Sequence, residues 1–211
     1  SYKGPVYRNP AGEVIFLSPA PARLYEQQER ALSHIKAALD RERFSACLLH
    51  GITGSGKTEV YYRAVEHVLS KGRQAILMAP EISLAGYMEG LFRSRMGQGV
   101  VVYHSGLSRG ERYDQWMRIL KGKAGLVIGA RSALFAPLPR PGLIIVDEEH
   151  DVAYKQERNL RYQARDAAVV RAKMERAVVV LGSGTPSVQS YHNGICLLYT
   201  SPSPRDLSTS R

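Results

Sequence analysis

Cysteines and long hydrophobic runs are both scarce in this sequence. Only Cys47 and Cys196 occur among its 211 residues, far apart and without neighbouring metal-ligand spacing, so neither a disulfide framework nor a zinc site is indicated. No apolar stretch approaches the roughly 18–20 residues that a membrane-spanning helix requires, and residues 1–10 lack the apolar stretch of a signal peptide. We therefore expect a globular protein of the cytoplasm, with Cys47 in its core.

Acidic residues are also few. Asp and Glu total 19 against 29 Lys and Arg, which gives a formal net charge of +10 at pH 7. An excess of this size favours a polyanionic partner, because basic side chains that neutralise phosphates release counterions. Nucleic acid is the expected partner in preference to an anionic membrane surface, and we expect a monomer.

The pattern of apolar residues indicates one α/β domain between two polar ends. Residues 1–23, with four prolines, are interpreted as a linker from a preceding region, and residues 195–211, rich in serine and proline, as an unstructured tail. Within residues 24–194, short apolar runs alternate with stretches of helical period, which is typical of a parallel sheet with helices on both faces. The predicted strands are residues 46–50, 75–79, 100–103, 125–128, 143–146 and 177–181, and the clearest helix covers residues 61–69.

A phosphate-binding loop follows the first predicted strand. Residues 51–58, GITGSGKT, match the pattern GxxxxGK[ST] in full, between a strand and a helix. Glycines permit the positive φ angles that turn several backbone N–H groups toward one anion, and the helix adds the positive end of its dipole. Lys57 is expected to reach the β and γ phosphates of ATP, and the Thr58 hydroxyl to bind Mg²⁺. The predicted nucleotide contacts are Gly51, Thr53, Gly54, Ser55, Gly56, Lys57 and Thr58; a plain glycine-rich turn is the alternative.

An acidic segment follows another buried strand. A fully apolar run ends abruptly in Asp147, Glu148, Glu149 and His150, at the sheet edge where the phosphate loop also lies. We expect Asp147 to hold Mg²⁺, Glu148 to orient or deprotonate the attacking water, and His150 to sense the γ-phosphate. Lys57, Asp147 and Glu148 are thus the predicted catalytic residues. The alternative for this acidic segment is a solvated loop or a helix cap.

Seven segments occur in a fixed order along the chain: HGITGSGKTEVY, APEISL, YHSGLSRGER, GARSALF, IIVDEEH, YKQERNLRYQARD and LGSGTPSVQSYHN. Their sequences and order resemble the first helicase lobe of the PriA family of replication-restart helicases, from about residue 24 to residue 193. The DEEH sequence and the loop that follows it distinguish this family from other superfamily 2 helicases. The resemblance implies a RecA-like P-loop NTPase lobe that binds ATP and Mg²⁺. In the intact protein it implies ATP-driven 3′ to 5′ DNA unwinding during primosome assembly at stalled forks.

The resemblance assigns roles to three further residues. Gln28 occupies the place of the family's adenine-reading glutamine, whose amide can both donate to and accept from a base edge. The alternative is an exposed glutamine on a helix. Ser183 and Thr185 match the motif that couples ATP hydrolysis to unwinding.

A basic and aromatic loop after the acidic segment is predicted to contact single-stranded DNA. Aromatic rings stack on bases while lysine and arginine bind phosphates, and residues 151–166 combine both kinds of side chain. The resemblance adds two residues of GARSALF, where the family contacts DNA. The alternative is a solvated charged loop. The predicted DNA contacts are Arg131, Ser132, Tyr154, Lys155, Arg158, Arg161, Tyr162 and Arg165.

The resemblance also implies parts of the protein outside this sequence, which we therefore expect to be a fragment. In the family a second lobe supplies an arginine that stabilises the transition state of hydrolysis, and zinc-binding cysteines and N-terminal DNA-binding domains are expected elsewhere in the protein. The implied partners are single-stranded and forked DNA, primosome proteins and single-stranded DNA-binding protein, at the nucleoid. Residues 196–211 resemble translated sequencing-adapter DNA and are predicted to be non-native.

Two other functions are compatible with the same motifs. One is a different superfamily 2 translocase of the RecG, UvrB or restriction-enzyme type, against which DEEH and the following loop argue. The other is a module that binds ATP or DNA without turnover, which the isolated lobe could itself be. Stimulation of ATP hydrolysis by single-stranded DNA distinguishes them, since only a motor requires it.

Overall fold

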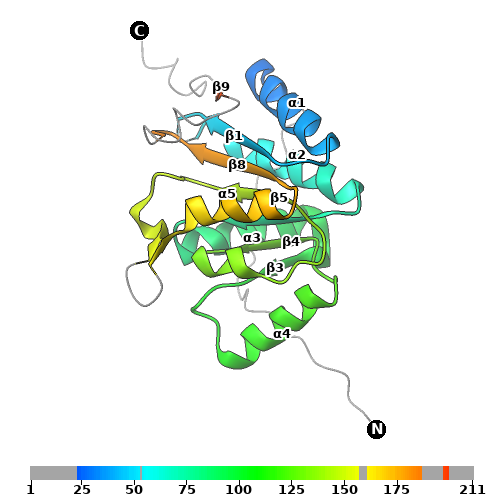
Figure 1. Cartoon of the computed structure of the whole chain (residues 1–211), viewed down its shortest axis with the longest axis vertical. Helices are drawn as coiled ribbons and strands as arrows, with labels where there is room; N and C mark the ends of the chain where they lie inside the picture. Colours follow the sequence, from blue (N-terminus) through cyan, green and yellow to red (C-terminus); the bar gives the residue numbers. More distant parts are fainter. Residues whose placement is uncertain (1–22, 53, 157–160, 187–196, 200–211) are drawn as a thin grey trace.

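The computed structural model describes residues 23–52, 54–156, 161–186 and 197–199. Helices and strands alternate along this part of the chain (Figure 1). The helices are α1 (Glu26–Asp40), α2 (Lys57–Ser70), α3 (Ile82–Met96), α4 (Arg109–Leu120) and α5 (Ala164–Met174), with the 3-10 turns η1 (Gly97–Gly99), η2 (Arg131–Phe135) and η3 (Val152–Tyr154). The strands are β1 (Ser45–His50), β2 (Gln74–Met78), β3 (Val100–Val102), β4 (Leu126–Gly129), β5 (Pro141–Val146), β6 (Lys155–Gln156), β7 (Tyr162–Gln163), β8 (Val178–Ser183) and β9 (Leu197–Tyr199).

One parallel sheet forms the centre of the fold. Its strand order is β3-β4-β2-β5-β8-β1-β9, and every neighbouring pair runs parallel. The six predicted strands are confirmed as β1 to β5 and β8, each to within two residues at either end. Because β8 lies between β5 and β1, the end of β8 separates the phosphate loop, which follows β1, from the acidic segment, which follows β5. The short hairpin of β6 and β7 forms a separate antiparallel pair.

Helices cover both faces of the sheet, as predicted from the alternating pattern. Successive strand residues point to opposite faces, so Leu49, Leu77 and Ile145 pack with α1, α2 and α3 in one buried layer. Leu48 and Ile144 instead lie in a second buried layer with residues of α4 and α5. Strands buried on both faces explain why each one reads as a nearly continuous apolar run.

The predicted amphipathic helix is α2. Tyr61, Ala64, Val65 and Val68 are all buried, at the three- and four-residue spacing that places side chains on one face of a helix. Leu69 is partly buried against the same layer. This face fixes α2 against the sheet, so the first turn of the helix is held at the carboxyl edge of β1.

The two ends of the chain lie largely outside the described residues, and the predicted linker at 1–23 is described only at Arg23. At the other end, Leu197–Tyr199 form β9 beside β1, with Leu48 opposite Leu197. At these three residues the structure differs from the expected unstructured tail, because parallel pairing satisfies backbone groups on the edge of β1. The non-native origin of residues 196–211 stays a prediction, as does the domain boundary at residue 194.

Two simpler expectations can be compared directly with the structure. Cys47 is buried in the core, as predicted, and Cys196 lies outside the described residues. Within the described ranges, no helix combines the length and the apolar character needed to cross a membrane.

Candidate functional site

The phosphate loop has the backbone that its glycines were expected to permit. Gly54 and Gly56 have φ angles of 82° and 80°, in the left-handed region that favours glycine. Gly51 N–H donates to the Ser183 carbonyl at 3.0 Å, which ties the loop to the end of β8. Of the other predicted contacts, Ser55 is buried and Thr58 is half-buried. Thr53 lies outside the described residues.

Gln28 holds the start of α1 against this loop. Its Nε2 donates to the Ser55 carbonyl at 2.8 Å, and its Oε1 accepts from the Tyr25 N–H at 3.0 Å. A Cβ atom at Gly56 would lie 2.4 Å from Gln28 Nε2, so a larger residue there would displace the end of the Gln28 side chain, and the φ angle of 80° itself favours glycine. Gln28 is buried, which excludes the alternative of an exposed helix glutamine. That the Gln28 amide recognises the adenine base of ATP stays a prediction.

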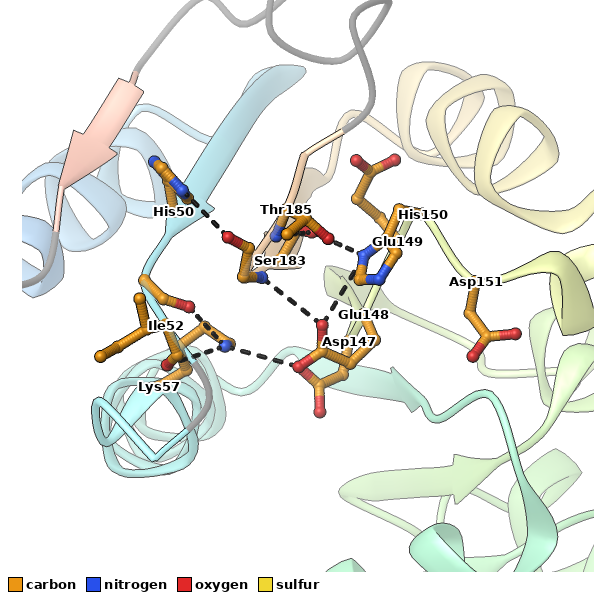
Figure 2. Close-up of polar contacts among 12 residues, drawn as sticks. His50, Ile52, Lys57, Asp147, Glu148, Glu149, His150, Asp151, Ser183 and Thr185 are labelled. Atoms are coloured by element: carbon orange, nitrogen blue, oxygen red, sulfur yellow. Dashed lines mark hydrogen bonds and ion pairs between the residues drawn. The ribbon is translucent and has the colours of Figure 1, made fainter. Parts of the chain in front are cut away.

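Lys57 is the first residue of α2 and points back across the loop. Its Nζ donates to the carbonyls of Gly51 at 2.7 Å and Ile52 at 3.4 Å. The same atom lies 3.5 Å from Glu148 Oε1 in an ion pair, with only 7% of the lysine side chain exposed. Figure 2 shows this lysine between the loop and the acidic segment. The structure therefore brings together the two motifs that the sequence places about 90 residues apart.

Asp147 is held inside the fold and Glu148 faces the loop. The Tyr61 hydroxyl donates to Asp147 Oδ1 at 2.9 Å, and Asp147 is only 6% exposed. Burial raises the pKa of Asp147, while the hydrogen bond from Tyr61 and the charge of Lys57 oppose this rise. Glu148 has a φ of 46°, a left-handed turn that is uncommon outside glycine and that directs its carboxylate toward Lys57.

The donor set at this edge of the sheet suits Mg²⁺. A carboxylate at Asp147 and a hydroxyl at Thr58 are the oxygen ligands that Mg²⁺ takes alongside nucleotide phosphates. Both residues lie at the carboxyl edge of the sheet, Thr58 in the first turn of α2 and Asp147 directly after β5. Two roles stay predictions: that Asp147 holds Mg²⁺, and that Glu148 orients the attacking water.

The predicted coupling residues contact the acidic segment directly. His150 Nδ1 lies 2.7 Å from Ser183 Oγ and 3.7 Å from Glu148 Oε2 (Figure 2). Ser183, which is fully buried, also accepts a hydrogen bond from the Thr185 N–H at 3.1 Å. The end of β8 therefore contacts both the histidine and, through it, the glutamate of the acidic segment.

Sequence reasoning missed His50, which lies directly before the phosphate loop. Its Nε2 is 3.2 Å from the Gly184 carbonyl, and the Gly184 N–H donates to Glu148 Oε2 at 3.5 Å (Figure 2). The sequence signals were the position of His50 at the end of a predicted strand and its place as the first residue of the segment HGITGSGKTEVY. Its partner is 134 residues away in the chain, so the contact itself could not be inferred.

Arg165 and Glu149 form a buried ion pair that corrects one predicted DNA contact. Arg165 Nη1 lies 3.2 Å from Glu149 Oε2, and Glu149 has no exposed surface. Arg165 Nε also contacts Asp166 at 2.8 Å. Because its guanidinium is buried and occupied by carboxylates, Arg165 does not offer its charge to a DNA phosphate. The sequence segment mixes aromatic and charged residues, and this composition does not show that Arg165 faces inward.

Tyr154 and Ser132 are also corrected. Tyr154 is fully buried, and its hydroxyl contacts the carbonyls of Asp147 at 2.6 Å and Met78 at 3.1 Å. A ring held in this way cannot stack on a base. The Ser132 hydroxyl oxygen is enclosed as well and forms no hydrogen bond with the described residues, so it does not face a phosphate.

Of the remaining predicted DNA contacts, the four that the structure describes lie near one another and are exposed or half-buried. Arg131 donates from Nη1 to the Lys155 carbonyl, which joins η2 to the β6–β7 hairpin. The ring of Phe135, 53% exposed, meets Tyr162 edge to face with 5.5 Å between ring centroids. Arg161 is exposed beside Tyr162. Phe135 was missed as a candidate, although it is the last residue of GARSALF, and Arg158 lies outside the described residues.

The parallel sheet, with the phosphate loop and the acidic segment at the same edge, defines a P-loop lobe of the helicase type. The chain matches the DEAD/DEAH box helicase family over residues 25–193 and belongs to that family.

Within this family, the chain is similar to the replication restart protein PriA. It is 48% identical to PriA of Bacillus subtilis over 186 residues, which is 88% of this chain and 23% of that protein. It is 48% identical to PriA of Chlamydia pneumoniae over 181 residues, 85% of this chain and 24% of that protein. The chain thus spans about a quarter of the length of these relatives.

Solved structures support the same fold. RecG bound to a three-way DNA junction superposes with a TM-score of 0.67 and 22% identity, over 87% of this chain and 25% of that one. A hypothetical ATP-dependent RNA helicase from Sulfolobus tokodaii gives a TM-score of 0.53 and 14% identity, over 82% and 57% of the two chains. At such identities the likeness concerns the fold alone.

Proposed function

We propose that the chain is the ATP-binding lobe of a replication-restart DNA helicase. The observation that carries this proposal is the ion pair between Lys57 and Glu148, 3.5 Å apart at the carboxyl edge of the sheet. In P-loop ATPases the lysine contacts the β and γ phosphates while an acidic residue orients the attacking water. A γ-phosphate entering the loop would take over the charge of Lys57 and leave Glu148 available for that water. The similarity to PriA supports the assignment to replication restart.

Each nucleotide-site residue has a defined task in this proposal. The N–H groups of Gly54 and Gly56 would face the phosphates and the α2 dipole would add to their attraction, while the Ser55 N–H donates to the Ile52 carbonyl at 3.0 Å and shapes the loop. Thr58 and Asp147 would hold Mg²⁺, which neutralises the charge that develops on the transferred phosphoryl group. His150, Ser183 and Thr185 would pass the state of the γ-phosphate from Glu148 to β8, because their contacts join these elements.

The DNA-binding surface in this proposal consists of Arg131, Phe135, Lys155, Arg161 and Tyr162. The exposed ring of Phe135 and the half-buried ring of Tyr162 would stack on bases, while the cations around them would bind phosphates and provide salt-dependent affinity. Several further parts of the proposal rest on the resemblance to PriA. They are the 3′ to 5′ direction, forked DNA as substrate, the primosome proteins and single-stranded DNA-binding protein as partners, and action at the nucleoid. The arginine of a second lobe and a zinc site would belong to the rest of such a protein.

Hydrolysis by the chain alone tests whether efficient turnover needs a residue from a second lobe. ATP turnover would be measured with and without a single-stranded oligonucleotide, in parallel with full-length PriA of Bacillus subtilis. We expect the chain to turn over ATP roughly 10³ to 10⁵ times more slowly, because the arginine that stabilises the transition state is supplied by a second lobe. Strong DNA-stimulated turnover by the chain alone would show that no such residue is needed.

A further inference from the structure

We infer that Tyr61 is a positioning residue for the carboxylate of Asp147, and that residue 182 is glycine to make room for it. This inference rests on the proposed function, in which Asp147 holds Mg²⁺. It adds a buried hydroxyl and a glycine of β8 to the residues that shape the magnesium site.

Helix α2 presents Lys57 and Tyr61 to the same edge of the sheet. The two residues are four positions apart, so they lie one above the other on one helical face. Lys57 reaches Glu148, and one turn further along the Tyr61 hydroxyl donates to Asp147 Oδ1 at 2.9 Å. The adjacent carboxylates of Asp147 and Glu148 therefore each contact a side chain of α2.

Gly182 explains why this hydroxyl can lie where it does. A Cβ atom at residue 182 would lie 1.6 Å from the Tyr61 hydroxyl oxygen, 2.9 Å from its Cζ and 3.3 Å from Asp147 Oδ1. The backbone of Gly182 does not have a positive φ, so its conformation alone would accept any residue. The space taken by the hydroxyl is thus the reason that a side chain is excluded at this position of β8.

A fixed carboxylate matters because Mg²⁺ demands nearly ideal octahedral geometry. Outer hydrogen bonds orient metal-binding carboxylates, and their loss typically weakens metal affinity by about 10-fold to 100-fold. With Oδ1 engaged by Tyr61 inside the fold, the carboxylate of Asp147 cannot rotate without breaking a buried hydrogen bond. Tyr61 would therefore act on the metal through Asp147 and not by touching the nucleotide.

The test is a Mg²⁺ titration of the full chain with fluorescent ADP as the probe. For Tyr61→Phe we expect ADP affinity in EDTA to stay within about twofold, while the Mg²⁺ concentration for half-maximal response rises about 10-fold. Gly182→Ala should raise the Mg²⁺ concentration for half-maximal response at least as much, because the new Cβ displaces the Tyr61 hydroxyl. Tyr62→Phe is the matched control, since that buried tyrosine contacts Phe92 and Arg95 instead.

The outcomes separate the inference from the proposed function. Absence of Mg²⁺-dependent ADP binding in the unmodified chain would overturn the proposed function and the inference with it. Normal binding by the unmodified chain, with an unchanged Mg²⁺ response in Tyr61→Phe, would overturn the inference alone. Equal loss of affinity with and without Mg²⁺ would assign Tyr61 a purely structural role and would also overturn it.

Discussion

Replacing Arg165 with alanine should destabilise the fold without a direct effect on DNA binding. Glu149 has no exposed surface, and the 3.2 Å ion pair with Arg165 neutralises it. Removing one partner of a buried ion pair typically costs about 3–5 kcal/mol, because the lost attraction no longer offsets the cost of burying the other charge. For a domain of this size each kcal/mol lowers the melting temperature by about 2–4 °C, so the expected loss is roughly 6–20 °C.

Thermal melting followed by circular dichroism measures this loss directly. Arg161→Ala is the matched control, since that arginine is exposed and its replacement should change stability by less than about 0.5 kcal/mol. The double variant Arg165→Met/Glu149→Leu should recover most of the stability, because apolar side chains of similar size commonly replace a buried pair without loss. A melting temperature unchanged in Arg165→Ala, together with weaker DNA binding, would refute the reasoning and return Arg165 to the DNA surface.

Two further predictions concern the acidic segment and the DNA surface. Burial raises the pKa of Asp147 above its ordinary value of 3.8, so its ionisation opposes folding increasingly as pH rises through the raised pKa. Asp147→Asn should therefore raise the melting temperature at about pH 8 but not at about pH 3, and an equal gain at both would contradict this cause. Tyr162→Ala should weaken binding of a single-stranded oligonucleotide by about 1–3 kcal/mol in a fluorescence anisotropy titration, whereas Tyr154→Phe should leave it unchanged. Unchanged binding in Tyr162→Ala would remove this half-buried ring from the proposed DNA surface.

The positions of the strands along the chain were predictable because their signals are local. Each strand is an uninterrupted apolar run, and burial on both faces makes such runs easy to recognise. The phosphate loop was equally visible, since the positive φ angles of Gly54 and Gly56 demand glycine at fixed spacing. These features depend on neighbouring residues, so one sequence suffices to find them.

The direction in which side chains point was not predictable in the same way. Tyr154 and Arg165 lie in a segment of mixed rings and charges, and only the packed structure shows both turned inward. The contact of Tyr61 with Asp147 joins residues 86 positions apart, and the space at Gly182 depends on both. Such contacts depend on how α2, β5 and β8 meet, which a local pattern does not contain.

The most direct test of the central claim is a titration of fluorescent ADP with Mg²⁺ into the unmodified chain and into Lys57→Ala. Lys57 is the mobile cation of the phosphate loop, and loss of a charge-assisted contact to phosphate should weaken binding by about 10-fold or more. Lys71→Ala, at the opposite end of α2 and half-exposed, is the control and should bind as the unmodified chain does. The account predicts that only Lys57→Ala loses affinity, and equal affinity in all three proteins would contradict it.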